Sequence, residues 1–223
     1  MIITVTTTKG GAGKTTIAIN LAVAYAHQGK EVCIIDTDTD QYSSIRWSNR
    51  RDEEEKDITV IRVGEDKLIK EAYKFSKKFD VVIIDGRPTM SDSLDSAVVA
   101  CDVVIIPVSP SVLELDAFQD FIPRVKKIKD MREGRNENDT LTAFAVLNGL
   151  DSKSNISKEI GEAIRAITNK NDYITLLDSK IYNRVAYRNS LTGGLGVLEE
   201  GDPKAKGEIQ ALIKELDSKL NSK

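Results

Sequence analysis

A glycine-rich stretch near the start of the chain constrains the fold most strongly. It follows an apolar, β-rich run over residues 2–7 and precedes a helical pattern that begins at Ile17. In that context, glycines let the backbone wrap closely around phosphate oxygens, and the helix N-terminus presents free N–H groups to the anion. The stretch predicts a phosphate-binding loop formed by Lys9, Gly10, Gly11, Ala12, Gly13, Lys14, Thr15 and Thr16.

Two residues of this loop have distinct expected roles, and the start of the loop departs from the usual pattern. Lys14 is expected to reach the β- and γ-phosphates, and the Thr15 hydroxyl to coordinate Mg²⁺. Against the strict pattern G-x-x-x-x-G-K-T, Thr8 replaces the first glycine and is followed by a second lysine, Lys9. The loop therefore carries two lysines where an ordinary loop of this kind has one.

The form K-G-G-x-G-K-T-T resembles the deviant Walker A motif of the ParA/MinD family of ATPases. The resemblance implies that ATP and Mg²⁺ are the cofactors and that the protein forms an ATP-dependent homodimer. In that dimer, Lys9 is implied to reach across the interface to the nucleotide held by the partner subunit. Lys9 and Lys14 are thus both expected to act in catalysis.

Acidic residues follow two apolar runs that are typical of buried parallel strands. Asp36 and Asp38 come after the run over residues 32–35, and Asp85 closes the run over residues 79–84. Ligands of α/β sheets bind at the carboxyl ends of the strands, where these carboxylates are expected to lie. We therefore expect all three acids at the nucleotide site.

The family resemblance gives these acids separate roles. The stretch from Asp36 to Gln41 resembles the family's second motif, D-x-D-x-Q, and Asp85 matches its Walker B aspartate. The resemblance implies that Asp36 and Asp85 hold hydrated Mg²⁺ and that Asp38 orients the attacking water. The predicted metal site therefore comprises Thr15, Asp36 and Asp85, and Asp38 is a predicted catalytic residue.

Further positions extend the resemblance. Residues 101–115 are similar to the proline-bearing loop of ParF-like partition ATPases, which lies near the nucleotide and the dimer interface. Asn148, at the carboxyl end of an expected strand, is implied to contact adenine, although Asn also favours turns. Arg87 stands where the family has a proline. It either approaches the phosphates or points to solvent or a partner.

Length, charge and cysteine content limit the remaining possibilities. A chain of 223 residues is expected to form a single P-loop ATPase domain over residues 1–223. Its formal net charge of −3 creates no global attraction to nucleic acid, so DNA binding would need a local patch. Cys33 and Cys101 lie in or beside apolar runs and are expected to be buried thiols. We expect a cytoplasmic protein without a signal peptide or membrane-spanning run.

Apolar runs and helical patterns alternate along the chain. This alternation predicts an α/β fold: a mostly parallel, doubly wound sheet with helices on both faces. The expected strands are residues 2–7, 32–35, 58–63, 79–85, 103–107, 139–148 and 173–177. The expected helices are residues 17–28, 43–51, 66–78, 117–131, 157–168, 180–191 and 205–220.

Two of these helices bear on partners. Lys180, Arg184 and Arg188 recur every four residues over 180–191, which indicates either a solvated face or a stripe that contacts DNA phosphates. The helix over 205–220 has one apolar face, which predicts packing on the sheet or, alternatively, a membrane-surface helix. Its acidic residues disfavour anionic lipid, so we expect no stable membrane association.

Together these features resemble a small ParA-type partition ATPase, closest to the ParF-like group. The resemblance implies non-specific DNA binding by the ATP-bound dimer, nucleoid association in that state, and a centromere-binding partner that stimulates hydrolysis during plasmid or chromosome segregation. Two alternatives stay open. One is a MinD-like membrane-associated positioning ATPase, and the other is a P-loop kinase or ligase acting on a small molecule, in which Lys9 would have no evident role.

Overall fold

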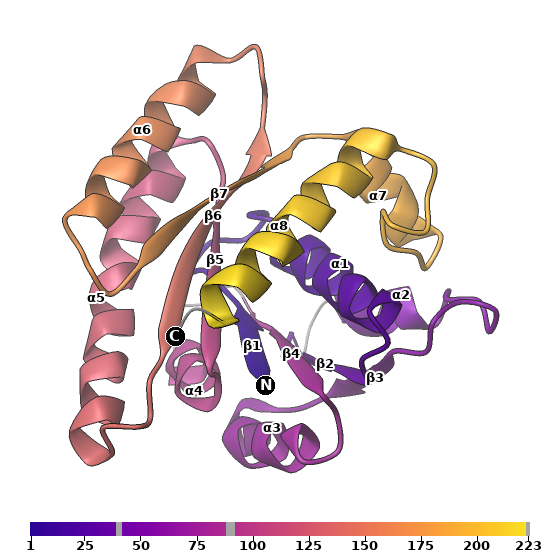
Figure 1. Cartoon of the computed structure of the whole chain (residues 1–223), viewed down its shortest axis with the longest axis horizontal. Coiled ribbons are helices and arrows are strands. Elements are labelled where there is room, and N and C mark those ends of the chain that lie inside the picture. Colours follow the sequence, from indigo (N-terminus) through magenta and orange to yellow (C-terminus); the bar gives the residue numbers. More distant parts are fainter. Residues whose placement is uncertain (39–41, 88–91, 222–223) are drawn as a thin grey trace.

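The computed structural model describes residues 1–38, 42–87 and 92–221 and contains a seven-stranded sheet in which every pairing is parallel. The strand order is β3-β2-β4-β1-β5-β6-β7, as Figure 1 shows. The strands are β1 (Ile2–Val5), β2 (Val32–Asp36), β3 (Thr59–Arg62), β4 (Val81–Asp85), β5 (Val103–Val108), β6 (Thr142–Leu150) and β7 (Thr175–Tyr182).

Helices cover both faces of this sheet (Figure 1). One apolar cluster joins the sheet to α1 (Lys14–His27), α2 (Ser43–Ser48), α7 (Val185–Thr192) and α8 (Pro203–Asn221). The other joins it to α3 (Leu68–Ser76), α4 (Asp92–Ala100), α5 (Val112–Arg135) and α6 (Asn155–Asn169), and a short 3₁₀ turn, η1 (Glu65–Lys67), precedes α3. The predicted doubly wound α/β fold is confirmed.

The central strands are buried from end to end because both of their faces are covered. Every residue of β1, β2, β4 and β5 is buried, which explains their nearly continuous runs of Ile and Val. The register pairs Asp36 on β2 with Asp85 on β4. Two acids far apart in the sequence therefore emerge side by side at the carboxyl edge of the sheet.

The predicted helix over residues 180–191 is wrong in its first part. Lys180 lies on β7, which continues to Tyr182, and α7 begins only at Val185. The β-branched and aromatic residues around Ile181 favour the strand, and pairing with β6 decides it. Lys180, Arg184 and Arg188 therefore do not form a stripe on one helix face.

Two other helices differ from expectation. Residues 92–100 form α4, which the sequence patterns did not predict, and α5 begins at Val112 rather than at residue 117. The Ser111 hydroxyl accepts a hydrogen bond from the Glu114 N–H at 3.2 Å and so caps the start of α5. Pro123 lies inside α5 without ending it.

The last helix, α8, is fastened to the edge strand β7. Its apolar residues Ile209, Leu212 and Leu216 are fully buried, which confirms the prediction that this face packs on the sheet. Glu215 accepts hydrogen bonds from two β7 backbone amides, each at 2.8 Å, and Glu208 accepts one from Tyr182 N–H at 3.1 Å. These carboxylates occupy donors that an uncovered edge strand would offer to another chain.

Within the described residues, no helix has the length and apolar character needed to span a bilayer.

A buried ion pair ties the segment after α7 to the turn after α2. Arg51 donates to both carboxylate oxygens of Glu199, at 2.6 and 2.9 Å, and Gly196 N–H donates to one of them at 2.8 Å. Burial alone would raise the pKa of Glu199, but these hydrogen bonds and the charge of Arg51 bring it down to about 2. The ionised form of Glu199 is therefore part of the folded structure.

Replacing this carboxylate tests its contribution. We expect Glu199→Gln to lower the free energy of unfolding at pH 7 by about 2 kcal/mol, because Arg51 is left buried without its counter-charge. The advantage of the wild type should be complete above the ordinary glutamate pKa of 4.5 and should fade as the pH falls towards 2. Denaturant titrations between pH 3 and 7 measure this.

The control is Glu71→Gln, which removes the partly exposed i,i+3 partner of Lys74 on the surface of α3. Surface pairs of this kind contribute about 1 kcal/mol or less. A loss at Glu199 no larger than the loss at Glu71 would contradict the structural role assigned to the buried pair.

Candidate nucleotide-binding site

A cleft of ≈ 280 Å³ opens at the carboxyl edge of the sheet, where β1, β2 and β4 end. The glycine-rich loop, the residues following β2 and those following β4 all contribute to it. Most of the predicted site residues meet here. The cleft is lined by Gly10, Gly11, Gly13, Lys14, Thr15, Thr16, Asp38, Ser43, Asp85 and Gly86.

The backbone of the loop requires glycine at one position in particular. Gly13 has φ +85°, in the left-handed region that residues with a Cβ rarely adopt. A Cβ there would also lie 2.2 Å from the Asn148 side-chain nitrogen. The conformation and the space together explain why α1 starts directly after a glycine, with its first N–H groups facing the cleft.

Asn148 binds the backbone of the glycine-rich loop through its side chain. Its side-chain amide donates a hydrogen bond to the Ala12 carbonyl at 2.7 Å, and the residue is buried at the end of β6. This contact fixes the loop from β6, which lies two positions from β1 and three from β4 in the sheet. The sequence prediction for Asn148 was an adenine contact, and that role stays a prediction.

The two lysines of the loop have different surroundings. Lys14 is 6% exposed, and its ammonium group donates to the Lys9 carbonyl, whereas the Lys9 side chain is exposed. Burial lowers the pKa of Lys14, and the nearby carboxylates of Asp85, Glu114 and Asp38 counteract part of that effect. Lys14 is thus a desolvated cation that faces into the cleft, while Lys9 stands at its rim.

Asp36 organises the segment that follows β2. One of its oxygens accepts from Asp38 N–H at 3.0 Å, and the other accepts from Ser44 N–H at 3.0 Å and Ile45 N–H at 3.3 Å. Burial raises the pKa of Asp36, although these backbone hydrogen bonds favour the ionised form. Asp36 therefore holds the start of α2 in place, and its contact with hydrated Mg²⁺ stays a prediction.

Asp85 has the environment expected of a cation ligand. It is 3% exposed, and one oxygen accepts from the Ser44 hydroxyl at 2.8 Å. The other oxygen, Oδ1, is buried and makes no hydrogen bond to any residue that the structure describes. Burial raises the pKa of Asp85 to about 7, and Asp36 adds to the rise, while Ser44, Thr15 and Lys14 oppose it.

The donor set at this point fits Mg²⁺. A buried carboxylate oxygen without a partner is costly unless a cation or water satisfies it. The Thr15 hydroxyl lies beside Asp85 in the cleft and opposes the rise of its pKa, and oxygen ligands of this kind are those that Mg²⁺ prefers. Asp85 and Thr15 can therefore hold the ion beside the phosphates.

Ser44 and Glu114 are site residues that the sequence analysis missed. Ser44 joins the two acids, because its N–H binds Asp36 while its hydroxyl binds Asp85. The only signal for it was a serine at the start of a helix that follows two acids. Burial raises the pKa of Glu114, in the first turn of α5, while Lys14 and Lys9 lower it. These electrostatic interactions place the end of the predicted proline-bearing loop near the site.

The remaining predicted positions divide into two groups. Asp38 lines the cleft and is partly buried. Arg87 is also partly buried but is not among the residues that line the cleft. Gln41, at the end of the stretch that resembles the second motif, lies outside the described residues.

Comparisons with known proteins agree with this geometry. The family model of the CobQ/CobB/MinD/ParA nucleotide binding domain matches residues 3–197. Among known relatives, maintenance of carboxysome distribution protein A of Halothiobacillus neapolitanus is 24% identical over 213 residues, which cover 93% of this chain and 92% of that protein. Protein ParA of Rhizobium radiobacter is 31% identical over 113 residues, which cover 51% of this chain and 50% of that protein.

The solved structures show the same fold. The MinD cell division protein of Aquifex aeolicus superposes with a TM-score of 0.71 at 18% identity, over 97% of each chain. The glycine-rich loop, the cleft and the acids at the ends of β2 and β4 all fall within the range that the family model covers. The chain therefore belongs to the CobQ/CobB/MinD/ParA family of nucleotide-binding proteins.

Proposed function

We propose that this protein is a ParA-type ATPase that dimerises on ATP, binds DNA non-specifically and positions a cargo by cycles of hydrolysis. Plasmid or chromosome segregation with a centromere-binding partner is the proposed use of this cycle. The family membership supports the ATPase activity and the use of ATP and Mg²⁺. Among its structural neighbours, a plasmid partition protein of Borrelia burgdorferi was solved with AMPPNP bound.

The observation that carries the proposal is the separation of the two lysines. Lys14 is buried and faces its own cleft, whereas Lys9 is exposed at the rim. Beside the rim, Val112 and Leu113 at the start of α5 are 64% and 69% exposed, and neighbouring Glu114 interacts with both lysines. A second copy facing this edge would cover the apolar pair and give Lys9 a phosphate to contact.

The residues of the cleft divide the work of hydrolysis. Lys14 and the N-terminus of α1 bind and neutralise the phosphates, and Thr15 and Asp85 hold Mg²⁺. The ion, when bound, withdraws charge from the phosphates in the transition state. Asp38 orients the attacking water, which leaves positioning rather than covalent chemistry as the protein's main contribution.

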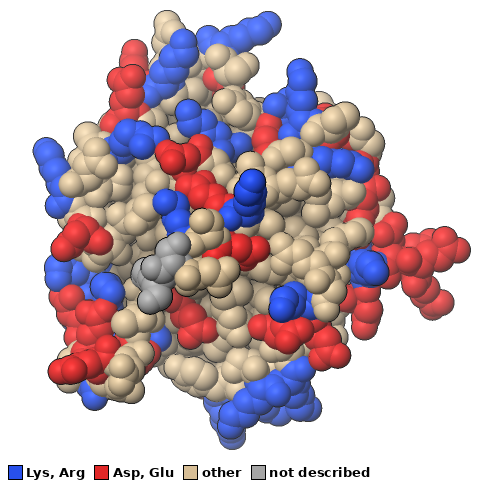
Figure 2. All heavy atoms as spheres, viewed as in Figure 1, with Lys and Arg blue, Asp and Glu red and all other residues tan. Residues whose placement is uncertain are grey.

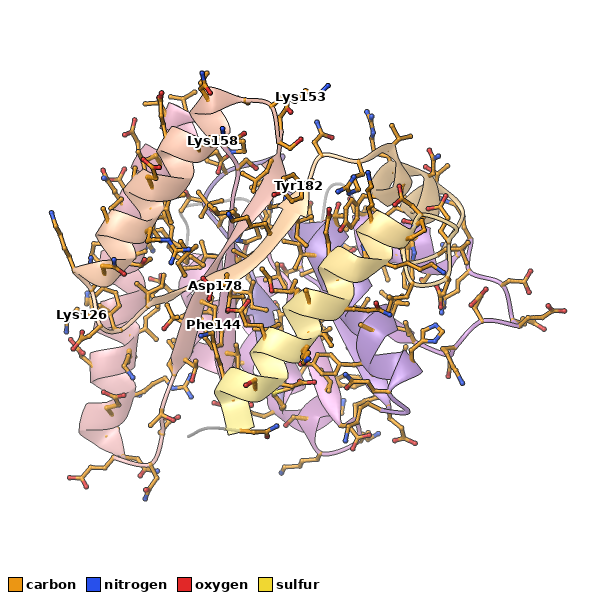
Figure 3. All side chains as sticks on the ribbon, turned by 45° about the horizontal axis from the view of Figure 1, so that its top comes forward. Lys126, Phe144, Lys153, Lys158, Asp178 and Tyr182 are labelled. Carbon is orange, nitrogen blue, oxygen red and sulfur yellow. The ribbon has the colours of Figure 1, made fainter. Side chains whose placement is uncertain are left out.

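A groove over the carboxyl ends of β6 and β7 is the proposed DNA surface; we call it the β7 groove. It consists of two adjoining hollows of ≈ 290 and ≈ 390 Å³ that share Tyr182. In Figure 2, Lys and Arg side chains gather at this end of the molecule, and Figure 3 shows Lys153, Lys158 and Tyr182 there. The basic lining residues are Lys158, Arg165, Lys180, Arg184 and Lys204, against the acidic Asp151 and Glu162.

The groove changes the earlier expectation for DNA binding. Lys180 and Arg184 still line it, but from the end of β7 and the start of α7, while Arg188 does not. Arg184 donates to Glu208 at 2.6 Å and so helps to fasten α8. Lys158 and Lys180 are exposed and are the better probes of phosphate contacts.

Membrane attachment of the MinD type is the alternative to DNA binding. The buried face of α8 opposes it, because the helix would have to leave the sheet to offer Ile209, Leu212 and Leu216 to lipid. Co-sedimentation with anionic liposomes in the presence of ATP and Mg²⁺ tests this alternative. ATP-dependent binding to the liposomes would replace the DNA surface in the proposal.

The two lysines should fail in different ways when removed. We expect Lys14→Ala to abolish nucleotide binding and Lys9→Ala to keep nucleotide affinity but lose ATP-dependent dimerisation, because Lys9 serves the partner's phosphates. Equilibrium binding and sizing chromatography of both variants measure this, with the exposed Lys30→Ala as the control. Equal loss of nucleotide affinity in both variants would remove the separate role of Lys9.

The role of Asp38 can be separated from binding. We expect Asp38→Ala to bind ATP and Mg²⁺ but to hydrolyse ATP about 10²-fold more slowly, because the attacking water is no longer oriented. The variant should accumulate as an ATP-bound dimer that stays on DNA. Single-turnover hydrolysis, measured beside ATP-dependent DNA retention, decides the matter, and a wild-type rate would assign the water to another residue.

The β7 groove is tested by removing two charges. We expect the double variant Lys158→Ala/Lys180→Ala to weaken binding to DNA of any sequence and to reduce the slope of log affinity against log salt by about two units. Nucleotide affinity should stay unchanged. The matched control is Lys70→Ala/Lys77→Ala at α3, whose lysines form another basic patch, at the bottom of Figure 2. If only the control pair weakens binding, the DNA surface lies at α3.

A further inference from the structure

Thr37 lies between Asp36 and Asp38, directly after β2. It joins this segment to the segment that follows β4. The residue is 2% exposed. Its hydroxyl donates to the Asp85 carbonyl at 2.8 Å, and its N–H donates to the same oxygen at 3.2 Å. In turn, Arg87 N–H donates to the Thr37 hydroxyl at 3.0 Å. One side chain thus binds the backbone on both sides of Gly86.

These hydrogen bonds extend the sheet beyond its last paired residues. The register of β2 and β4 ends at Asp36 and Asp85. On the other side of β4, Gly86 N–H continues the pairing with β1 by donating to the Val5 carbonyl at 3.0 Å. The Thr37 hydroxyl adds a link between the chain after β2 and the chain after β4, and in this position it must donate and accept at once. Only a hydroxyl residue of this size does both, and Val, of the same shape, does neither.

The residues on either side of this bridge carry the chemistry of the cleft. Asp38 follows Thr37 directly, and its N–H is held by Asp36 at 3.0 Å. Asp85, whose carbonyl accepts from Thr37, presents its unpartnered Oδ1 from the neighbouring strand. The distance between the water-orienting acid and the cation-binding acid therefore depends on how firmly the two loops are joined.

We propose that Thr37 is a positioning residue for ATP hydrolysis, which acts by locking the Asp38 loop to the loop after Asp85. The proposal rests on the ATPase function proposed above. Thr37 contacts no reacting atom in this arrangement; it sets where Asp38 stands relative to the metal site. A displacement of about 1 Å in such a group can slow turnover about 10²-fold while leaving ground-state binding intact.

The chain offers a matched control for this lock. Thr4 is also fully buried in the sheet, and its hydroxyl likewise donates to a backbone carbonyl, that of Ala97, at 2.8 Å. Thr4 lies in β1, but its bond leads to α4 rather than to a loop of the cleft. Thr4→Val and Thr37→Val therefore remove the same chemical group from similar surroundings, and only the second breaks the bridge.

Two measurements test the proposal on the whole 223-residue chain. The first is hydrogen exchange of the Arg87 amide without nucleotide, which Thr37→Val should accelerate about tenfold, since one hydrogen bond of roughly 1–1.5 kcal/mol is lost. The second is steady-state ATP hydrolysis with Mg²⁺. Thr37→Val should lower kcat about tenfold or more with KM little changed, and Thr37→Ser should restore both measurements.

Several outcomes would overturn the proposal. Equal losses of kcat in Thr4→Val and Thr37→Val would mean general destabilisation, and a rise in KM matching the loss of kcat/KM would mean a role in binding. Faster Arg87 exchange with an unchanged kcat would show that the lock exists but does not position Asp38. A wild-type protein that does not hydrolyse ATP would overturn the ATPase assignment itself, while the Arg87 exchange would still decide whether the hydroxyl joins the loops.

Discussion

The site depends on two carboxylates held side by side in a buried place. The parallel pairing of β2 with β4 puts Asp36 opposite Asp85, and neither acid has more than a trace of exposure. Two like charges in such a place repel each other and lose hydration. The structure compensates with backbone amides on Asp36, with the Ser44 hydroxyl between the two acids, and with Lys14 across the cleft. Among the described residues, Oδ1 of Asp85 has no hydrogen-bond partner. A divalent cation fits this oxygen because the cation supplies the missing positive charge.

The frame around these acids is rigid where the site needs it. All residues of β1, β2 and β4 are buried, so their ends cannot shift without disturbing both helical layers. At the far edge of the sheet, β7 is the last strand in the order of the described residues, and α8 covers it with two glutamates that bind the β7 backbone. Apolar packing and edge protection are therefore provided by the same helix, which explains why Glu208 and Glu215 face the strand.

The sequence predicted what local pattern determines and missed what tertiary contact determines. The loop with Gly13, the buried runs that end in Asp36 and Asp85, and the alternation of strands and helices follow from spacing and apolar content alone. Lys180 was misplaced because Ile181 and Tyr182 join a sheet through pairing with β6, which no local window contains. Ser44 and Thr37 were missed for the same reason: each acts through a partner more than 40 residues away. Both residues reach Asp85 only because β2 pairs with β4 in this register, and the sequence does not reveal that pairing.

The groups that the folded chain leaves unsatisfied lie along one edge of the sheet. Among the described residues, the four most exposed large apolar side chains are Val112, Leu113, Ile156 and Val185. Each lies at the start of a helix that follows a parallel strand, and thus at the carboxyl edge that also carries Lys9 and Asp85. Exposing apolar side chains to water costs free energy in a single molecule. A partner that covers these side chains removes them from water and makes association favourable. The proposed cycle follows from this arrangement: bound nucleotide would neutralise the centre of the edge, and only then could a second copy cover its apolar rim.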